Sequence, residues 1–300
     1  MKMPREPNKQ QELALLKLEK AMDKKLTAYY KQALADIQAS IGAYEAKGIL
    51  TQADMYKYGR LLQLEKSIDE SMARLTGQTT NTIKAGLKST AITAYHSTGF
   101  IIELQAQANL SFGKISDDVI KRAIANPFDR IGWLKRNAAN NSQAAGQLKD
   151  ALVQGLIQGR SYKDISKTVA QRLEISENRA KVIARTENHR VMNAARSEAM
   201  SHAENLGVKI QKRWVAALDD RTRSAHGELD GQQVDRDDLF EVHGFRADAP
   251  GQFGVPELDI NCRCSMISVV VGYEPEFRRV RGEGIVPYKT YEEWAKARDL

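Results

Sequence analysis

An apolar stripe with helical spacing near the start of the chain most constrains what this sequence can fold into. Its members follow one another at intervals of three or four residues, which is the repeat of one face of an α-helix. Gly48 indicates where this helix stops, and Thr51 with Asp54 is typical of the N-cap of the next one. The stripe consists of Leu15, Leu18, Met22, Leu26, Tyr30, Leu34, Ile37, Ile41 and Tyr44. The sequence therefore predicts long helices that pack against one another through such stripes.

The helical pattern continues to about residue 205, where Gly207 provides a stop. Turn-forming residues interrupt it in the middle of the chain, and Trp133 is expected to anchor the connection there. Ser161 with Asp164 predicts a further N-cap, and Ser176 is expected to begin the last long helix. Helices are expected over residues 51–75, 79–110, 143–155 and 176–205, with breaks at 126–127 and 137–142.

The character of the chain changes after Gly207, because Gly and Pro become frequent and the apolar runs become short. Residues 208–216 and 266–271 have the composition of β-strands. Thr290 with Glu293 predicts a cap for a short final helix over residues 291–298. The expected fold class is α+β: a long-helix N-terminal bundle or stem, followed by a compact, loop-rich C-terminal segment with short β-strands.

These patterns divide the chain into three expected domains. The first is a variable helical stem or bundle, the second joins helices to a small β-rich segment, and the third is a tail with a short helix. The boundaries are 1–142 for the stem, 143–272 for the second domain (helices over 143–206, β-rich segment over 208–272) and 273–300 for the tail.

Composition excludes several classes of protein. The 300 residues are 42% hydrophobic and 28% charged, which is ordinary for a globular chain and unlike collagen, low-complexity or disulfide-rich sequences. No run approaches the roughly 18 apolar residues that would span a bilayer, and the N-terminus lacks the apolar core of a secretory signal. No membrane association is therefore expected, and we expect the chain to occupy the cytoplasm first.

The net charge of +7 is distributed unevenly along the chain. Residues 1–150 contain 22 Lys and Arg against 15 Asp and Glu, whereas residues 151–300 contain 23 of each kind, so the whole excess lies in the first half. A basic half can attract a polyanion such as double-stranded DNA through phosphate contacts without reading its sequence. The alternative is a solvated helical surface.

Sequence signatures of several enzyme classes are missing. The chain has no Walker-type loop, no G-x-G-x-x-G after a strand and no G-x-S-x-G motif. Their absence argues against an ATPase, a dinucleotide-dependent dehydrogenase or an α/β-hydrolase.

Glu187 is a carboxylate on a helical face of otherwise small, apolar residues such as Ala180 and Ala184. A buried carboxylate requires a cation or several hydrogen-bond donors. The expected role of Glu187 is a buried ion pair that docks its helix on the C-terminal segment, and the alternative is the general acid or base of a transferase. The candidate partners are Arg221, Arg223 and Arg263.

Asp219 and Asp220 form a turn after the first expected strand, and His226 follows closely. An Asp in a turn commonly hydrogen-bonds to its own backbone, which is the structural interpretation. Clustered Asp and His would also suit a metal-dependent hydrolase or nuclease, although no second acidic or His motif of fixed spacing accompanies them.

Cys262 and Cys264 are the only cysteines, and they are too close in sequence to form a useful disulfide staple. In an extended chain both would point to the same face. With His226 and His243 they would make a four-ligand zinc site. The alternative is two reduced cysteines packed in a small core, and the spacing differs from that of a standard zinc finger.

An ordered set of these residues resembles the phage Mu F-like minor head protein family, whose conserved region is the phage head morphogenesis domain. The resemblance covers roughly residues 145–272, and the first half of the chain is similar to the family only in its helical character. The residues that carry it include Arg185, Thr186, Glu187, Trp214, Asp219, Asp220, Arg221, Arg223, His226, Gly231, Asn261, Cys262, Arg263 and Cys264, together with Lys212, Arg213, Pro250, Gly251 and Pro256.

The resemblance implies a minor capsid component of a tailed bacteriophage that assists head assembly, DNA packaging or DNA delivery. It implies association with the portal protein, with the scaffold or major capsid protein as further partners, and non-specific contact with DNA. The expected location is the head interior or portal vertex, after assembly in the host cytoplasm. The family has no established catalytic residues, so no enzyme and no required cofactor are expected, zinc excepted. Some relatives carry a toxin domain after this region, and none is expected here because the sequence ends at Leu300.

Overall fold

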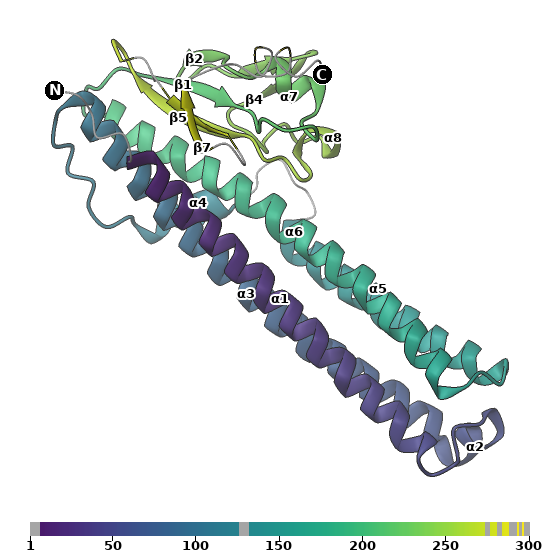
Figure 1. Cartoon of the computed structure of the whole chain (residues 1–300). Helices are drawn as coiled ribbons and strands as arrows, with labels where there is room; N and C mark the ends of the chain where they lie inside the picture. The colour runs from purple at the N-terminus through teal and green to yellow at the C-terminus, as the bar shows by residue number, and fades with distance from the viewer. Residues whose placement is uncertain are drawn as a thin grey trace. The chain divides into compact units, whose positions relative to one another are not determined.

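The computed structural model describes residues 7–125, 132–273, 277–280 and 284–287, together with Glu293 and Lys296 (Figure 1). Long helices come first and short antiparallel strands follow, which confirms the expected α+β class. The helices are α1 (Pro7–Glu45), α2 (Gln52–Tyr56), the 3-10 helix η1 (Lys57–Gly59), α3 (Arg60–Ala106), α4 (Asp117–Ile124), α5 (Gly132–Ile157), α6 (Tyr162–Glu204), α7 (Ser224–Glu228) and α8 (Pro256–Asp259). The strands are β1 (Ile210–Val215), β2 (Gln233–Asp235), β3 (Phe240–Val242), β4 (Phe245–Ala247), β5 (Ser265–Val270), β6 (Phe277–Val280) and β7 (Gly284–Pro287).

The chain forms two compact units, each assembled from separate stretches of sequence. The helical unit comprises Lys20–Ala85 and Ile131–Ala184, and the mixed unit comprises Met1–Glu19, Gly86–Arg130 and Arg185–Leu300. Helices α1, α3 and α6 each contribute to both units. The two units therefore do not correspond to the first two domains expected from the sequence, whose boundary was placed at residue 142.

The core of the helical unit is built from the apolar stripe of α1 and matching stripes of its neighbours. Tyr30, Ile37 and Ile41 are at most 2% exposed and pack in one cluster with Leu148 of α5 and Val169 of α6. Burying such side chains contributes roughly 1.5–3 kcal/mol each. The periodicity of the sequence thus selects the buried face of each helix.

Two helix breaks expected from the sequence are absent. Helix α3 runs through Thr79, and α6 runs through Ser176, without interruption. The Thr79 hydroxyl donates to the carbonyl of Leu75 one turn earlier at 2.9 Å, so it satisfies itself inside the helix instead of capping a new one. Ser176 is buried, and its hydroxyl accepts a hydrogen bond from Asn140.

The asparagine-rich run at residues 137–142 was expected to be a loop and is instead part of α5. Its amides are buried and bonded to other helices: Asn137 donates to the Thr79 hydroxyl at 3.0 Å, and Asn141 accepts from the Tyr30 hydroxyl at 2.6 Å. Burial raises the pKa of Tyr30 to about 12 against the lowering effect of its hydrogen bond with Ser176. Tertiary hydrogen bonds thus override the turn preference of asparagine.

The expected caps at Thr51 and Ser161 are confirmed. The backbone N–H of Asp54 donates to Thr51 Oγ1, and that of Asp164 donates to Ser161 Oγ, both at 3.2 Å. Each bond satisfies one of the amide groups that a helix start leaves without an intrahelical partner. Helix α5 begins at Gly132, earlier than the expected Gln143, and Trp133 is buried there.

The mixed unit contains a three-stranded antiparallel sheet in the order β2-β1-β5 and the hairpins β3-β4 and β6-β7. Strand β1 lies within the run expected over 208–216, and β5 begins one residue before the run expected over 266–271 and covers most of it. The two strands pair with Lys212 opposite Ser268 and Trp214 opposite Met266. Alternate residues of β1 are buried, as expected for a strand with one face on a core. The core around Trp214 includes Met200 of α6, Phe240 and both cysteines.

The short final helix expected over residues 291–298 lies outside the described residues, apart from Glu293 and Lys296, which are helical. In the part of the chain that the structure describes, no helix is both long enough and apolar enough to cross a bilayer.

Candidate functional site

Three of the four residues predicted to bind zinc meet in the core of the mixed unit. His226 comes from α7, and Cys262 and Cys264 lie in the connection between α8 and β5. The His226 Nδ1 atom is 3.2 Å from Cys264 Sγ and 3.8 Å from Cys262 Sγ. All three side chains are buried, and both cysteines are free thiols.

His243 lies apart from these three residues, so the predicted set of four zinc ligands is wrong. Its ring is 57% exposed, and its Nε2 atom pairs with Glu228 Oε2 at 2.8 Å. His243 sits in the tight turn between β3 and β4, with a positive φ of 49°. That turn directs the side chain to the surface.

The two thiols differ in acidity because their surroundings differ. The hydrogen bond that Cys262 shares with Cys264, together with burial, raises the pKa of Cys262 well above its ordinary value. Burial also raises the pKa of Cys264, but hydrogen bonds from Cys262, the Ala217 amide and Trp214 outweigh it, so the net pKa is lowered. Cys264 is therefore the thiol that ionises first.

The remaining motif residues fasten the chain around these cysteines. The Arg263 guanidinium grips Asp219 through two hydrogen bonds, one of them at 2.7 Å between Nη2 and Oδ1. The Arg223 guanidinium donates to the Ile260 carbonyl, and the Asn261 amide donates to the Thr186 hydroxyl at 3.1 Å. The loop that contains both cysteines is thus bonded to Asp219, to Arg223 and to Thr186 of α6.

Trp214 packs in the same core cluster as the two cysteines and is fully buried. Its ring meets His226 edge-on with centroids 5.9 Å apart, and it meets Phe240 in the same way at 5.3 Å. The Gly231 amide donates to the Trp214 carbonyl at 3.0 Å, and the positive φ of 83° at Gly231 favours glycine there.

Two of the residues named for a hydrolase, Asp219 and His226, have other partners in the structure. The Arg263 hydrogen bonds lower the pKa of Asp219 to about 2 against the opposing effect of burial, so this carboxylate is fully ionised and engaged at neutral pH. It also accepts from the Arg221 amide at 3.1 Å, which is the turn expected from the sequence. Asp220 is exposed, and His226 faces the two sulfurs.

Glu187 is buried in an ion pair as expected, but the predicted partners Arg221, Arg223 and Arg263 are wrong. Its Oε2 atom accepts from Arg190 Nε at 2.9 Å, and both side chains are at most 3% exposed. Arg190 lies one turn further along α6, so the partner is local. Arg185, on the same helix, lies 3.8 Å from Glu19 of α1.

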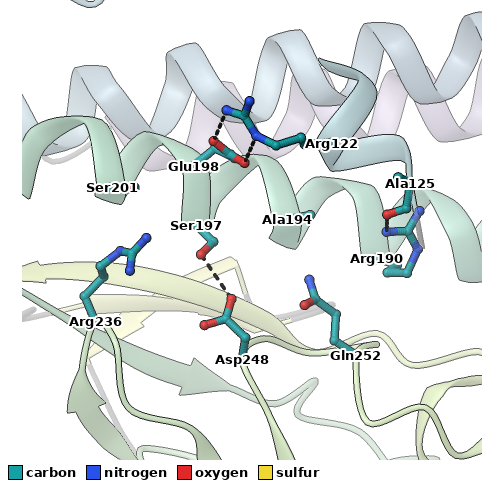
Figure 2. A pocket seen from close by; sticks show the side chains of 10 residues that line it. All are labelled: Arg122, Ala125, Arg190, Ala194, Ser197, Glu198, Ser201, Arg236, Asp248 and Gln252. Carbon is teal, nitrogen blue, oxygen red and sulfur yellow. Dashed lines mark hydrogen bonds and ion pairs between the residues drawn. The ribbon is translucent and has the colours of Figure 1, made fainter. Parts of the chain in front are cut away.

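Arg190 also binds the C-terminal end of α4, a contact that the sequence analysis missed. Its guanidinium donates to the carbonyls of Ala123, Ile124 and Ala125, of which the Ala125 contact is drawn in Figure 2. A cation at a helix C-terminus satisfies carbonyls that have no intrahelical partner and is favoured by the helix dipole. An arginine three residues after a buried glutamate was the available signal.

A polar pocket of about 210 Å³ lies between α4, α6 and the loops that carry Arg236 and Asp248 (Figure 2). Its cations already have anionic partners. Arg122 forms two hydrogen bonds of 3.0 Å to Glu198, and Arg236 pairs with Glu204 at 3.5 Å and with Asp237. The pocket therefore offers little net positive charge to a phosphate or carboxylate ligand.

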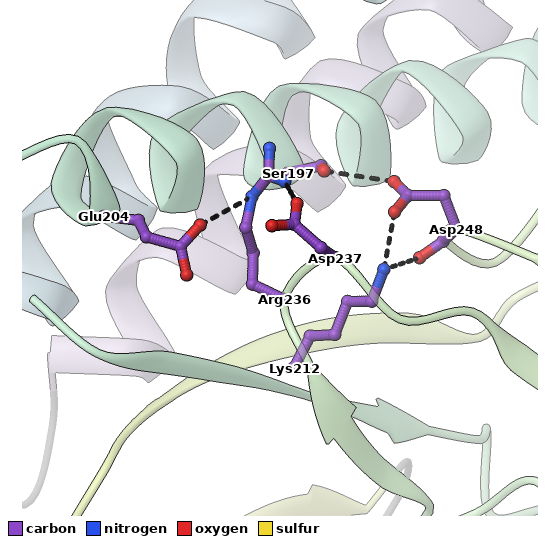
Figure 3. A network of polar contacts seen from close by, with 6 residues as sticks. All are labelled: Ser197, Glu204, Lys212, Arg236, Asp237 and Asp248. Atoms are coloured by element: carbon purple, nitrogen blue, oxygen red, sulfur yellow. Dashed lines mark hydrogen bonds and ion pairs between the residues drawn. The ribbon is translucent and has the colours of Figure 1, made fainter.

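A second buried charge fixes the sheet to α6 beside this pocket (Figure 3). The side chain of Lys212 in β1 is fully buried, and its Nζ atom donates to Asp248 Oδ1 at 2.5 Å and to the Asp248 carbonyl at 2.9 Å. The Asp248 carboxylate also accepts from Ser197 of α6 at 3.1 Å. The alternation of β1 places Lys212 on the inner face, which sequence inspection could have recognised.

Together these contacts define a protein with long helices and a mixed unit whose elements are joined by buried ion pairs and whose core contains a His-Cys-Cys cluster. Comparison with known proteins agrees with this class: residues 146–267 match the family described as Phage Mu protein F like protein. The chain is 33% identical to the minor head protein GP7 of Bacillus phage SPP1, over 97% of this chain and 98% of that protein. The chain belongs to the phage Mu protein F-like family.

Two further relatives are similar to parts of the chain. The NAD(+)–arginine ADP-ribosyltransferase EFV of Enterococcus faecalis is 31% identical over 91% of this chain, which spans only 56% of that enzyme. An uncharacterized protein of Haemophilus influenzae is 33% identical over 43% of this chain and 26% of its own length. No solved structure matches the chain.

Proposed function

We propose that this chain is a minor head protein of a tailed bacteriophage and acts in morphogenesis of the phage head. The observation that carries the proposal is its similarity to the minor head protein GP7, which extends over nearly the whole of both chains. A shared domain alone would support only a shared fold. Under this proposal the protein resides in the virion, in the head interior or at the portal vertex, after assembly in the host cytoplasm.

The contacts of the motif residues support a docking role over a catalytic one. Asp219 is held by Arg263, Glu187 is held by Arg190, and His226 faces two thiols. Three of the four side chains suggested as catalysts thus contact other parts of the mixed unit, and the fourth, Asp220, is exposed. A rigid module of this kind can present a fixed surface to an assembling partner.

The partner we propose is the portal protein of the same phage, with the scaffold or major capsid protein as further partners. Family resemblance motivates this choice, and long helices provide extended surfaces on which another helical protein can pack. Helix α1 has 39 residues and α3 has 47.

The test is co-expression of the full chain with that portal protein, followed by size-exclusion chromatography at low and moderate salt. We expect the two proteins to co-elute at both salt concentrations, because packed apolar helix faces are not screened by ions. An unrelated basic helical protein serves as the control. Separate elution at both salt concentrations would contradict portal binding.

Double-stranded DNA is a further proposed ligand, because residues 1–150 carry the entire excess of positive charge. Binding through phosphates requires no reading of bases and weakens steeply as salt rises. Retention of DNA at low salt only, with no portal complex, would favour a nucleic-acid role over head docking.

ADP-ribosyl transfer is the second candidate function, and the name of the Enterococcus faecalis relative favours it. The chain spans about half of that enzyme, and in this chain Glu187 is buried against Arg190. We expect no nicotinamide release from NAD(+) in the presence of an arginine-rich acceptor protein. Release that is abolished in Glu187→Gln would support the enzyme instead.

A further inference from the structure

We propose that His226, Cys262 and Cys264 bind one zinc ion in the core of the mixed unit. These three residues form a group whose ligand atoms all lie within 4.8 Å of one another, and no other such group occurs in the described part of the chain. The site is separate from the polar pocket and does not depend on the proposed role in head assembly.

The spacing of the ligand atoms fits a tetrahedral zinc ion. Zn–S bonds of about 2.3 Å and Zn–N bonds of about 2.0 Å place sulfur and nitrogen about 3.5 Å apart across a tetrahedral edge. The observed separations from His226 Nδ1, 3.2 Å to Cys264 and 3.8 Å to Cys262, lie on either side of that value. Binding therefore requires only small shifts of the side chains.

The donor set is chemically suited to zinc. Thiolates select soft or borderline metals, and imidazole is a common ligand for zinc, whereas magnesium and calcium prefer oxygen. Both thiols are free and buried, at 3% and 2% exposure, so neither is available for reaction with bulky partners in solution. A buried imidazole whose Nδ1 atom faces two sulfurs is in the position that a zinc ligand takes.

The surrounding contacts hold the ligands in place before any metal binds. Arg263, between the two cysteines, is anchored to Asp219, and Arg223 holds the Ile260 carbonyl just before them. Trp214 packs edge-on against the His226 ring. Such supporting contacts orient metal ligands and limit their motion.

The bound ion would join α7 to the loop before β5. The described residues supply three ligands, which leaves the fourth position of a tetrahedral ion to a water molecule or to a group outside them. Because the ligands are brought together only by folding, the binding energy adds to the stability of the folded mixed unit.

The experiment measures zinc in the full chain by elemental analysis, after purification under reducing conditions and incubation with zinc chloride followed by desalting. We expect about one zinc per chain, falling at least about tenfold in His226→Ala and in Cys264→Ser. His243→Ala is the matched control, since its ring pairs with Glu228 at the surface, and it should retain the metal. A zinc-free wild-type chain, or equal loss of zinc in the control, would overturn the proposal.

A second measurement covers the case in which the ligand variants fail to fold. Wild-type chain is treated with a strong chelator and then supplied with Co²⁺ alone, whose thiolate coordination gives a characteristic absorption. We expect this absorption, a melting temperature that falls on chelation, and its recovery with zinc. Absence of the cobalt–thiolate signal in folded chain, or a disulfide between Cys262 and Cys264 in freshly purified protein, would refute the site.

Discussion

Arg190 lies one turn after Glu187 in α6 and forms with it a buried ion pair that also holds the end of α4. The guanidinium donates to Glu187 at 2.9 Å and to three consecutive carbonyls at the C-terminus of α4. One side chain thereby satisfies a buried carboxylate and the carbonyl groups that a helix end leaves unpaired. The pair therefore joins α6 to α4 within the mixed unit.

Replacing either member of this pair should destabilise the fold strongly. We expect Arg190→Met to lower the free energy of unfolding by about 3 kcal/mol, because it removes a buried charge pair and the hydrogen bonds to the carbonyls at the end of α4. The measurement is urea unfolding followed by circular dichroism. Arg172→Ala, on an exposed site of the same helix, is the control and should change stability by less than about 0.5 kcal/mol. Equal effects of the two substitutions would contradict the structural role of Arg190.

The Lys212–Asp248 pair predicts an asymmetry between its two partners. Lys212 is fully buried, whereas the Asp248 side chain is 35% exposed. Asp248→Ala leaves the buried Lys212 ammonium without its carboxylate partner, so it should lower the free energy of unfolding by about 3 kcal/mol. Lys212→Met keeps an apolar stem in the core and leaves Asp248 in contact with water and Ser197, so it should cost only about 1 kcal/mol. Urea unfolding of both variants gives the comparison, and the reverse order would contradict this account.

The Asp219–Arg263 pair predicts a dependence of stability on acid. The pKa of Asp219 is lowered from 3.8 to about 2 in the folded chain, so its contribution is fully present above pH 3.8 and is lost as the pH falls through about 2. A shift of this size corresponds to roughly 2 kcal/mol. The free energy of unfolding of wild type minus that of Asp219→Asn should therefore shrink over that range. A difference that stays constant with pH would show that the pair contributes nothing through this carboxylate.

Most of the fold follows from periodicity, because the features that determine it are local. The stripe from Leu15 to Tyr44 selects the buried face of α1, and the hydroxyls of Thr51 and Ser161 mark helix starts that the structure confirms. The errors at Thr79 and Ser176 have a similar cause, because each hydroxyl finds a partner inside a continuous helix and caps none. Thr79 donates to the Leu75 carbonyl one turn earlier, and Ser176 accepts from Asn140 of α5.

Those parts of the site that depend on local sequence were predicted, and those that depend on tertiary packing were not. Cys262 and Cys264 are neighbours in sequence, and their pairing with His226 required only that α7 pack beside the loop. Spacing along the chain could not show that the turn at His243 directs its ring to solvent. The sequence pattern favours distant arginines as partners of Glu187, whereas the structure pairs it with Arg190, one helical turn away.

Gly155 tests whether close approach of α5 and α6 sets the packing of the helical unit. A Cβ atom at this position would lie 2.6 Å from Ile165 Cγ1, which is closer than unbonded carbon atoms can approach. We expect Gly155→Ala to destabilise the chain by about 1–3 kcal/mol despite the better helix propensity of alanine. Gly146→Ala, on the same helix, meets no atom within 4 Å and should stabilise by up to about 1 kcal/mol. Thermal unfolding of the two variants should show opposite shifts in melting temperature. The double variant Gly155→Ala with Ile165→Ala should lose less stability than the sum of the two separate losses, because Ile165→Ala removes the atoms that the new Cβ would meet. Stabilisation by both alanines would mean that the helices separate at no cost and that Gly155 has no role in their packing.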